Sequence, residues 1–202
     1  MPHDSSDTTG ERDTTIEVEF TAEEYRRLIE AVDDPAETVR DATMWRVDVA
    51  EAVANARAGE FAGPDGFAKL EKEQPPIWPY GALAGLETLS VDEGESRWAM
   101  DVGPELANPM GTVHGGVICD LGDAAMGTAY MSTVEPAESF ATVDLTANFI
   151  RPVRTGRVEA IGRVVHRGRT VGLVECEMTD EEGELVARLS STCLTLRDGT
   201  TD

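Results

Sequence analysis

Apolar and polar positions follow a helical period through the first part of the chain. Residues 21–24 (Thr-Ala-Glu-Glu) have the form of a capping box, and apolar side chains follow them at the spacing of one helix face. A second periodic stretch covers 36–57, and residues 67–74 are predicted to form a short helix before a proline-rich break. We therefore expect residues 1–80 to be an acidic N-terminal extension, disordered over 1–15 and helical after that.

From residue 81 onward the period changes to that of an antiparallel sheet that contains one helix. Alternating segments separated by turn residues predict strands at 84–92, 95–103, 138–151, 156–167, 170–179 and 184–197. Residues 114–131, between the second and third strands, are rich in Gly and Ala. Because glycine disfavours an isolated helix, this helix must pack closely against a surface that wraps around it. The order predicts an α+β domain over 81–202, with a curved antiparallel sheet around a central helix.

The charge of the chain narrows the choice of partners. Asp and Glu number 39 against 17 Lys and Arg, which gives a formal net charge of -22, and only Lys69 and Lys72 among the bases are lysines. Such a surface repels nucleic-acid phosphates and anionic lipids, so neither is an expected partner. Abundant acid with little lysine resembles the proteins of salt-accumulating halophiles, whose folds loosen in low salt. An acidic face that binds a protein partner is the alternative.

Cysteine spacing and the apolar runs exclude several classes of protein. Cys119, Cys176 and Cys193 form no Cys-x-x-Cys pair and no Cys/His cluster, so we expect neither a metal site nor a disulfide framework. The first 15 residues lack the apolar core of a signal peptide, and no run reaches the roughly 18 apolar residues of a membrane span. We expect a soluble, cytoplasmic protein that needs no metal or redox cofactor.

The densest group of chemically useful residues lies where the predicted central helix begins. The run Asn-Pro-Met-Gly-Thr-Val-His-Gly-Gly covers Asn108 to Gly116, and Asp123 follows among apolar residues. Free N–H groups at a helix start stabilise developing negative charge, and a carboxylate in apolar surroundings needs a partner or a function. Together they supply what acyl transfer to water requires. The alternative is a simple loop-to-helix turn with Asp123 exposed to solvent.

The longer context resembles a known family. The pattern N-x-x-G-x-x-H-G-G-x4-L-x-D, read from Asn108 to Asp123, is similar to that of hotdog-fold acyl-CoA thioesterases of the phenylacetic-acid-degradation (PaaI-like) group. Residues 141–152, which end in Phe-Ile-Arg-Pro, look like the central strand of that family, and the resemblance covers about 81–197. It implies hydrolysis of an acyl-CoA to free acid and coenzyme A by a homodimer or homotetramer whose active site lies at the subunit interface.

The resemblance also implies roles for individual residues. Gly115 would donate its backbone N–H to the thioester carbonyl oxygen, and Gly116 would contact the substrate. Asp123 would act as general base or as nucleophile, facing the His-Gly-Gly turn of the neighbouring subunit. Asp120, one turn away, is the alternative base. Asn108 and His114 would orient the acyl carbonyl, the thioester sulfur or the lytic water, and the Thr142 hydroxyl would position that water.

Arginines stand out in so acidic a chain. Arg151 and Arg167 end predicted strands and Arg169 lies just after one; all three could bind the phosphates of coenzyme A, or could simply be solvated. Two rival functions remain open on the sequence. One is a non-catalytic acyl-CoA sensor in which residues 1–80 act as effector, and the other is a hotdog enoyl-thioester hydratase.

Overall fold

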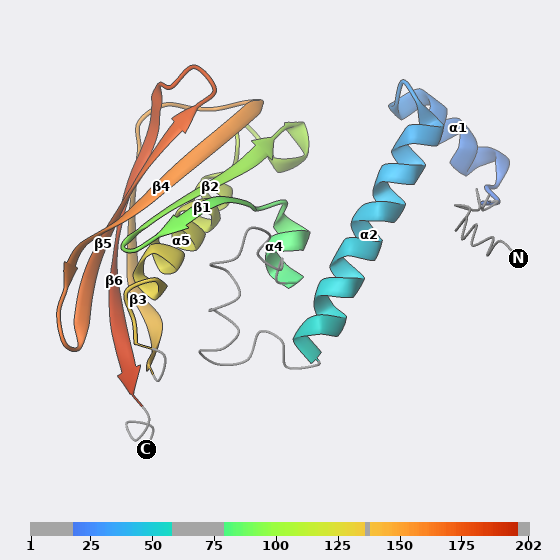
Figure 1. Cartoon of the computed structure of the whole chain (residues 1–202). Helices are drawn as coiled ribbons and strands as arrows, with labels where there is room; N and C mark the ends of the chain where they lie inside the picture. The colour runs from blue at the N-terminus through green and yellow to red at the C-terminus, as the bar shows by residue number, and fades with distance from the viewer. Residues whose placement is uncertain (1–17, 58–78, 136–137, 198–202) are drawn as a thin grey trace, which may run out of the picture. The chain divides into compact units, whose positions relative to one another are not determined.

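The computed structural model of the chain describes residues 18–57, 79–135 and 138–197 (Figure 1). The chain divides into two compact units, Met1–Thr43 and Met44–Asp202. The expected disordered start and the expected helix at 67–74 lie outside the described residues. The expected domain boundary after residue 80 stays a prediction. No helix in the described part of the chain is both long and apolar enough to cross a membrane.

The two helices predicted near the N-terminus are confirmed. Helix α1 (Ala22–Ala31) begins at a capping box, in which the Thr21 hydroxyl accepts from the Glu24 N–H and the Glu24 carboxylate accepts from the Thr21 N–H at 2.8 Å. The Thr21 hydroxyl also donates to the Glu24 carboxylate at 2.7 Å, and this hydrogen bond, with the one from the Thr21 N–H, lowers the pKa of Glu24. Helix α2 (Pro35–Arg57) follows Asp34, whose carboxylate accepts from the backbone N–H groups of the first helical turn.

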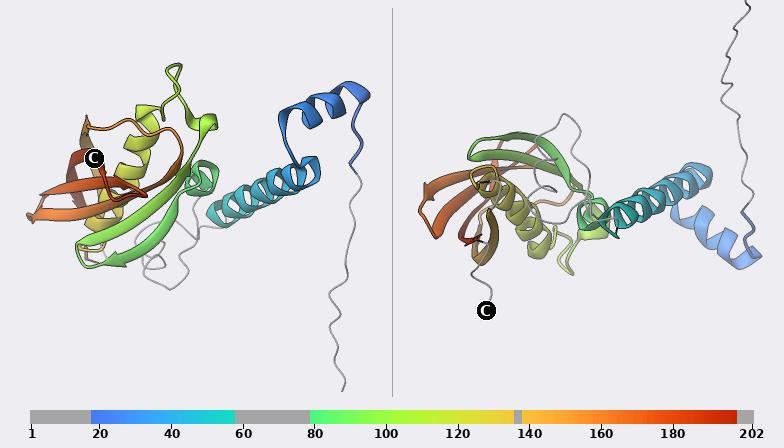
Figure 2. Two further views of the ribbon diagram at one scale, coloured as in Figure 1. Left: turned by 90° about the horizontal axis from the view of Figure 1, so that it is seen from above. Right: turned by 60° about the horizontal axis from the view of Figure 1, so that its bottom comes forward.

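A single antiparallel sheet curves around one helix, as predicted. The strands lie in the order β1 (Glu87–Asp92), β2 (Glu95–Val102), β4 (Gly156–Arg167), β5 (Val171–Asp180), β6 (Leu185–Arg197) and β3 (Glu138–Phe149). Each neighbouring pair is antiparallel. Helix α5 (Gly115–Met131) contacts every strand, and Figure 2 shows the sheet curving around it. The glycine- and alanine-rich helix α5 therefore lies on the inner face of the curved sheet.

One predicted boundary is wrong. The first strand was expected from residue 84, but Pro79–Ala84 forms a short helix, α4, and β1 begins only at Glu87. Proline is tolerated at the first position of a helix, because its missing N–H has no helical partner there and its φ already suits the helix. Gly85 then adopts φ 70°, a left-handed conformation that favours glycine, and leads the chain into β1. Pro79, which lies in the predicted proline-rich break, is therefore the first residue of a helix that the sequence did not predict.

Small residues let the backbone of α5 approach the sheet. The Ser96 hydroxyl, on β2, donates to the Ala125 carbonyl oxygen at 2.6 Å. Gly162 on β4 is the register partner of Ser96, and a Cβ added to it would lie 2.5 Å from that same oxygen. On the helix side, a Cβ on Gly122 would lie 2.5 Å from Leu189. These contacts explain why the helix could be rich in glycine and still be stable.

The space between helix and sheet is filled by large side chains. The largest fully buried apolar ones come from both layers: Trp98, Leu121, Met126, Tyr130, Val158 and Met178. Each contributes about 1.5–3 kcal/mol of hydrophobic stabilisation when fully buried. The Tyr130 hydroxyl also shares a hydrogen bond of 2.7 Å with Thr195 on β6. This core holds α5 in one position and so fixes the residues along it.

Strand β3 forms one edge of the sheet. It pairs only with β6 among the described strands, so its outer edge carries backbone groups with no strand beside them. Between Ser139 and Phe149 it contains a single charged residue, Asp144, in a chain of net charge -22. Val143, on the same strand, is 62% exposed. A long, weakly charged and partly apolar edge is a surface on which another strand can pair.

Candidate active site

His114 caps the helix on which the site is built. It is the N-cap residue of α5, and its Nδ1 accepts from the Gly116 N–H at 3.0 Å. Its carbonyl oxygen accepts from the Val117 N–H, also at 3.0 Å. Because Nδ1 accepts, the proton of the neutral imidazole lies on Nε2, where it can be donated to a ligand. His114 thus combines a capping role, which the sequence did not indicate, with an available donor.

The N–H of Gly115 is available at the helix start. Within the described residues it has no acceptor, whereas the N–H groups of Gly116 and Val117 are both bonded. The positive end of the helix dipole adds to its attraction for an oxyanion. A Cβ on Gly115 would lie 3.0 Å from the ring of Phe149, so an aromatic side chain covers this turn. The geometry provides the kind of donor that the sequence predicted.

A mostly apolar hollow of about 430 Å³ lies beside Gly115. It is lined by Asn108, Met110, Thr112, Val113, Gly115, Ile118, Phe149, Ile150, Arg151, Pro152, Val153 and Val186. Arg151 is the one charged residue in this lining. Phe149 and Ile150 are 58% and 54% exposed. Exposed apolar side chains beside a free backbone donor provide a surface for an apolar ligand with one polar group.

Asn108 builds the loop that leads into the hollow. Its amide nitrogen donates to the Thr112 hydroxyl at 2.9 Å, and its Oδ1 accepts from the Met110 N–H at 2.8 Å. Its own N–H donates to the Thr112 carbonyl oxygen at 2.7 Å. Gly111 closes the turn with φ 72°. The side chain therefore positions the loop, and its predicted contact with the thioester stays a prediction.

Asp123 and Thr142 are brought together by the fold. The Thr142 hydroxyl, on edge strand β3, donates to Asp123 Oδ1 at 3.2 Å. The Asp123 side chain is accessible to solvent, yet partial burial raises its pKa, the Thr142 hydrogen bond opposes that rise and the nearby charge of Asp120 adds to it. A carboxylate with a raised pKa beside a hydroxyl is suited to accepting a proton from water.

Asp120 has a different partner. The Tyr80 hydroxyl, on α4, donates to Asp120 Oδ2 at 2.5 Å. That hydrogen bond, together with burial, raises the pKa of Tyr80 to about 12, so the phenol stays protonated and bound. Of the two candidate bases, Asp123 is therefore the one beside the predicted water-positioning hydroxyl. Tyr80 belongs to no motif, and the sequence held no signal for its contact.

The predicted residues fall into two groups along α5. Around the helix start lie Asn108, His114, Gly115, Gly116 and Arg151. Asp123 lies eight residues after Gly115, which at 1.5 Å per residue is about 12 Å along the helix axis. One carbonyl cannot contact both the Gly115 N–H and the Asp123 carboxylate of the same chain.

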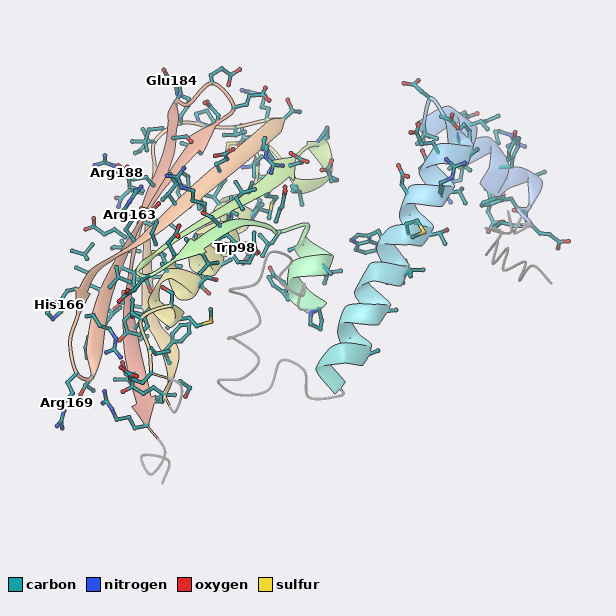
Figure 3. All side chains as sticks on the ribbon, viewed as in Figure 1. Trp98, Arg163, His166, Arg169, Glu184 and Arg188 are labelled. Carbon is teal, nitrogen blue, oxygen red and sulfur yellow. The ribbon has the colours of Figure 1, made fainter. Side chains whose placement is uncertain are left out.

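Arg167 and Arg169 lie elsewhere. Arg167 donates to Glu138 at 2.9 Å and lies over the Tyr130 ring, 5.0 Å from its centroid. Glu138 is buried; a hydrogen bond from the Glu135 N–H, with Arg197 and Arg167, lowers its pKa. Figure 3 shows Arg169 at the β4–β5 turn, at the opposite end of the sheet from Glu184. Within one chain only Arg151 of the three arginines lines the hollow.

Metal and thiol chemistry find little support in the described residues. No group of three or more His, Cys, Asp or Glu side chains in that part of the chain is arranged to hold a metal ion. Cys119 lies on α5, but burial and the charges of Asp120 and Asp123 raise the pKa of its thiol. A raised pKa keeps the thiol protonated and weakly nucleophilic.

Comparison with known proteins identifies a family. The model of the thioesterase superfamily matches residues 110–187. The 1,4-dihydroxy-2-naphthoyl-CoA hydrolase of Listeria monocytogenes is 28% identical over 102 residues, 50% of this chain and 83% of that protein. A conserved protein of Pseudomonas aeruginosa has a solved structure that is 32% identical with a TM-score of 0.56, covering 59% of this chain and 95% of that chain. The solved structure of a variant of phenylacetic acid degradation protein PaaI from Thermus thermophilus is 27% identical with a TM-score of 0.54, and the match covers 57% of this chain and 97% of that chain.

The chain therefore belongs to the thioesterase superfamily. Its curved six-stranded sheet around α5 is the hotdog fold, so the predicted α+β fold class is confirmed, and PaaI is among its structural neighbours. Membership supports hydrolysis of a thioester as the general reaction.

Proposed function

We propose that this protein hydrolyses acyl-CoA thioesters to the free acid and coenzyme A. The observation that carries the proposal is the pair of groups on α5, a free Gly115 N–H at the helix start and an Asp123 carboxylate held by Thr142. The name of the Listeria relative, a naphthoyl-CoA hydrolase, gives independent support for a CoA thioester as substrate.

The reaction follows from these two groups. The thioester carbonyl oxygen accepts from the Gly115 N–H, with His114 Nε2 and Asn108 as further orienting groups. Asp123 removes a proton from a water molecule that Thr142 positions, and the hydroxide attacks the carbonyl carbon. The tetrahedral oxyanion is stabilised at the helix start. Collapse breaks the carbon–sulfur bond, the thiolate takes a proton and the acid leaves. In the variant mechanism the Asp123 carboxylate attacks the carbonyl carbon itself, the carbon–sulfur bond breaks and the thiolate takes a proton, and water then hydrolyses the mixed anhydride to the acid and the free carboxylate.

The active site is shared between two copies of the chain in this proposal. The separation of about 12 Å along α5 prevents the two groups of one chain from acting on one carbonyl. Pairing of the β3 edges of two copies extends the sheet and buries the edge described above. Gly115 of one protomer then faces Asp123 of its partner, as a homodimer or as a tetramer of two such dimers.

Thiol release from a panel of acyl-CoA substrates tests the activity. The panel contains acetyl-, hexanoyl-, benzoyl- and phenylacetyl-CoA, and each is assayed in dilute buffer and in molar KCl with a thiol-reactive dye. We expect turnover of at least one of them, with kcat of about 1–10³ per second. Binding of every substrate without thiol release would support the sensor instead. Crotonyl-CoA is assayed beside the panel, and its hydration without thiol release would support the hydratase.

A mixture of two inactive variants tests the shared site. Asp123→Asn subunits lack the base, and Gly115→Pro subunits lack the N–H donor. In a one-to-one mixture of unfolded and refolded chains, half of the dimers are mixed and each has one intact site, so about a quarter of wild-type activity returns. Activity that stays at the level of the separate variants would contradict a site built from two chains.

A further inference from the structure

The backbone that carries Arg151 is fixed against the neighbouring strand. Arg151 lies two residues after the end of β3, and its N–H and that of Ile150 both donate to the Val186 carbonyl oxygen, at 3.1 and 2.9 Å. The side chain lines the hollow beside Gly115 and Asn108. The hollow therefore has one cation in its lining, on a backbone that cannot easily move away.

The Arg151 guanidinium is paired with a carboxylate from another part of the chain. Arg151 Nη2 donates to Glu184 at 2.6 Å. Glu184 follows the β5–β6 turn, where its N–H donates to the Asp180 carboxylate at 2.8 Å and its carbonyl oxygen accepts from the Asp180 N–H at 3.1 Å. Figure 3 shows Glu184 at that end of the sheet. Asp180 thus holds the turn in the shape that presents Glu184 to Arg151.

Both members of the ion pair are open to solvent. Their side chains are 47% and 57% exposed, so either one can exchange its partner for water or for a solute. A phosphate or carboxylate that enters the hollow presents at least two oxygens to the planar guanidinium and can replace Glu184 as its partner. The released Glu184 regains water, so the exchange has a small cost.

We propose that Glu184 is an internal counter-ion that competes with an anionic group of the substrate for Arg151 and so sets the affinity of the site. The inference rests on the proposed function, because it takes the hollow as the substrate site. The anionic group is a phosphate of coenzyme A or a carboxylate on the acyl chain, which share the same chemistry. In either case Glu184 lowers the affinity for the ligand that Arg151 binds.

Affinities for coenzyme A, measured by titration calorimetry, test the competition. Glu184→Gln removes the competitor and keeps the size of the side chain, so coenzyme A binds about two- to fivefold more tightly if one of its phosphates is the ligand. Glu182→Gln removes the same charge from the same turn, and Glu182 has no bond to Arg151, so it leaves the affinity unchanged. Arg151→Gln weakens binding, and adding Glu184→Gln to it has no further effect. Thermal melts verify that each variant is folded.

Pantetheine thioesters distinguish the two sources of the anion, and they are titrated into proteins that also carry Asp123→Asn so that they are not hydrolysed. Butyryl-pantetheine has neither phosphate nor carboxylate, and its affinity does not respond to Glu184→Gln. If the phosphate is the ligand, succinyl-pantetheine is equally insensitive. If the acyl carboxylate is the ligand, succinyl-pantetheine binds more tightly to the variant and coenzyme A does not. Either pattern supports the competition.

The inference is wrong if the Glu184→Gln variant binds every probe with the affinity of the wild type, or binds them more weakly. It is also wrong if Glu182→Gln changes the affinity as much as Glu184→Gln does. Binding is measured without turnover. If the wild type hydrolyses acyl-CoA but Glu184→Gln does not change the affinity for any probe, this inference alone is contradicted. A wild type that binds coenzyme A as described but releases no thiol contradicts the proposed function alone.

Discussion

Asp123→Asn lowers kcat for thioester hydrolysis by about 10²–10⁴-fold, the usual contribution of a general base. The amide oxygen of asparagine can still accept from the Thr142 hydroxyl, so the local geometry is kept. The amide cannot take a proton from water, so the loss falls on the chemical step. Steady-state kinetics on the best substrate of the acyl-CoA panel measure it.

The pH profile adds a signature to the same prediction. Because partial burial raises the pKa of Asp123, the carboxylate is lost at a pH above the ordinary value of 3.8, and kcat falls as the pH drops through that raised pKa. Asp120→Asn is the matched control. It removes a negative charge that helps to raise the pKa of Asp123, so the acidic fall in kcat moves to lower pH while most activity remains. If the Asp120→Asn enzyme is inactive and the Asp123→Asn enzyme is active, Asp120 is the general base and Asp123 is not.

Gly115→Pro removes the proposed oxyanion donor and leaves the helix in place. Gly115 is the first residue of α5, where proline is favoured, and His114 before it has φ -63° and ψ 135°, which suits a residue that precedes proline. Loss of one oxyanion donor costs about 10²–10³-fold in kcat. Steady-state kinetics at saturating substrate measure this loss, and circular dichroism verifies that the helix content is unchanged.

Gly115→Ala is the control for the added bulk. Its Cβ meets the Phe149 ring at the same 3.0 Å, but its N–H remains. Phe149 is 58% exposed and can move aside, so this variant keeps kcat within about tenfold of the wild type. Equal losses in the alanine and proline variants would show that crowding against Phe149, rather than the missing donor, lowers the activity.

Local patterns in the sequence were sufficient for the order of the elements and for part of the site. Segments of alternating apolar and polar residues predicted the six strands, and the small residues of 114–131 predicted a closely packed helix. The spacing from Asn108 to Asp123 predicted the backbone donor at the start of that helix and the carboxylate along it. All of these signals lie within short stretches of chain. The contact between Asp123 and Thr142 joins two such stretches and was not predicted, because the resemblance to a family implied only that the Thr142 hydroxyl positions the water.

Contacts between distant stretches were not predictable in the same way. Tyr80 and Asp120 are 40 residues apart, and Arg151 and Glu184 are 33 apart. Each contact depends on how the strands and helices align after folding, which no local pattern records. Arg167 is predicted to be available for a phosphate because bases are rare in this chain, yet in the folded chain it lies 2.9 Å from Glu138, which is at the start of β3. In a chain with so many acidic residues, an arginine such as Arg167 pairs with a carboxylate of the same chain and is not available for a phosphate.

The edge of β3 has a consequence for how the protein survives in a cell. An open strand edge can pair with the strand of an unrelated or partly folded chain, which is how many aggregates begin. Like charge keeps copies of this protein apart over most of the surface, but the stretch from Ser139 to Phe149 carries one charge and offers little of that protection. If that edge is covered by a second copy, newly made chains are vulnerable until they meet one another. Abundance then protects the protein, and scarce chains are the ones lost to aggregation and degradation.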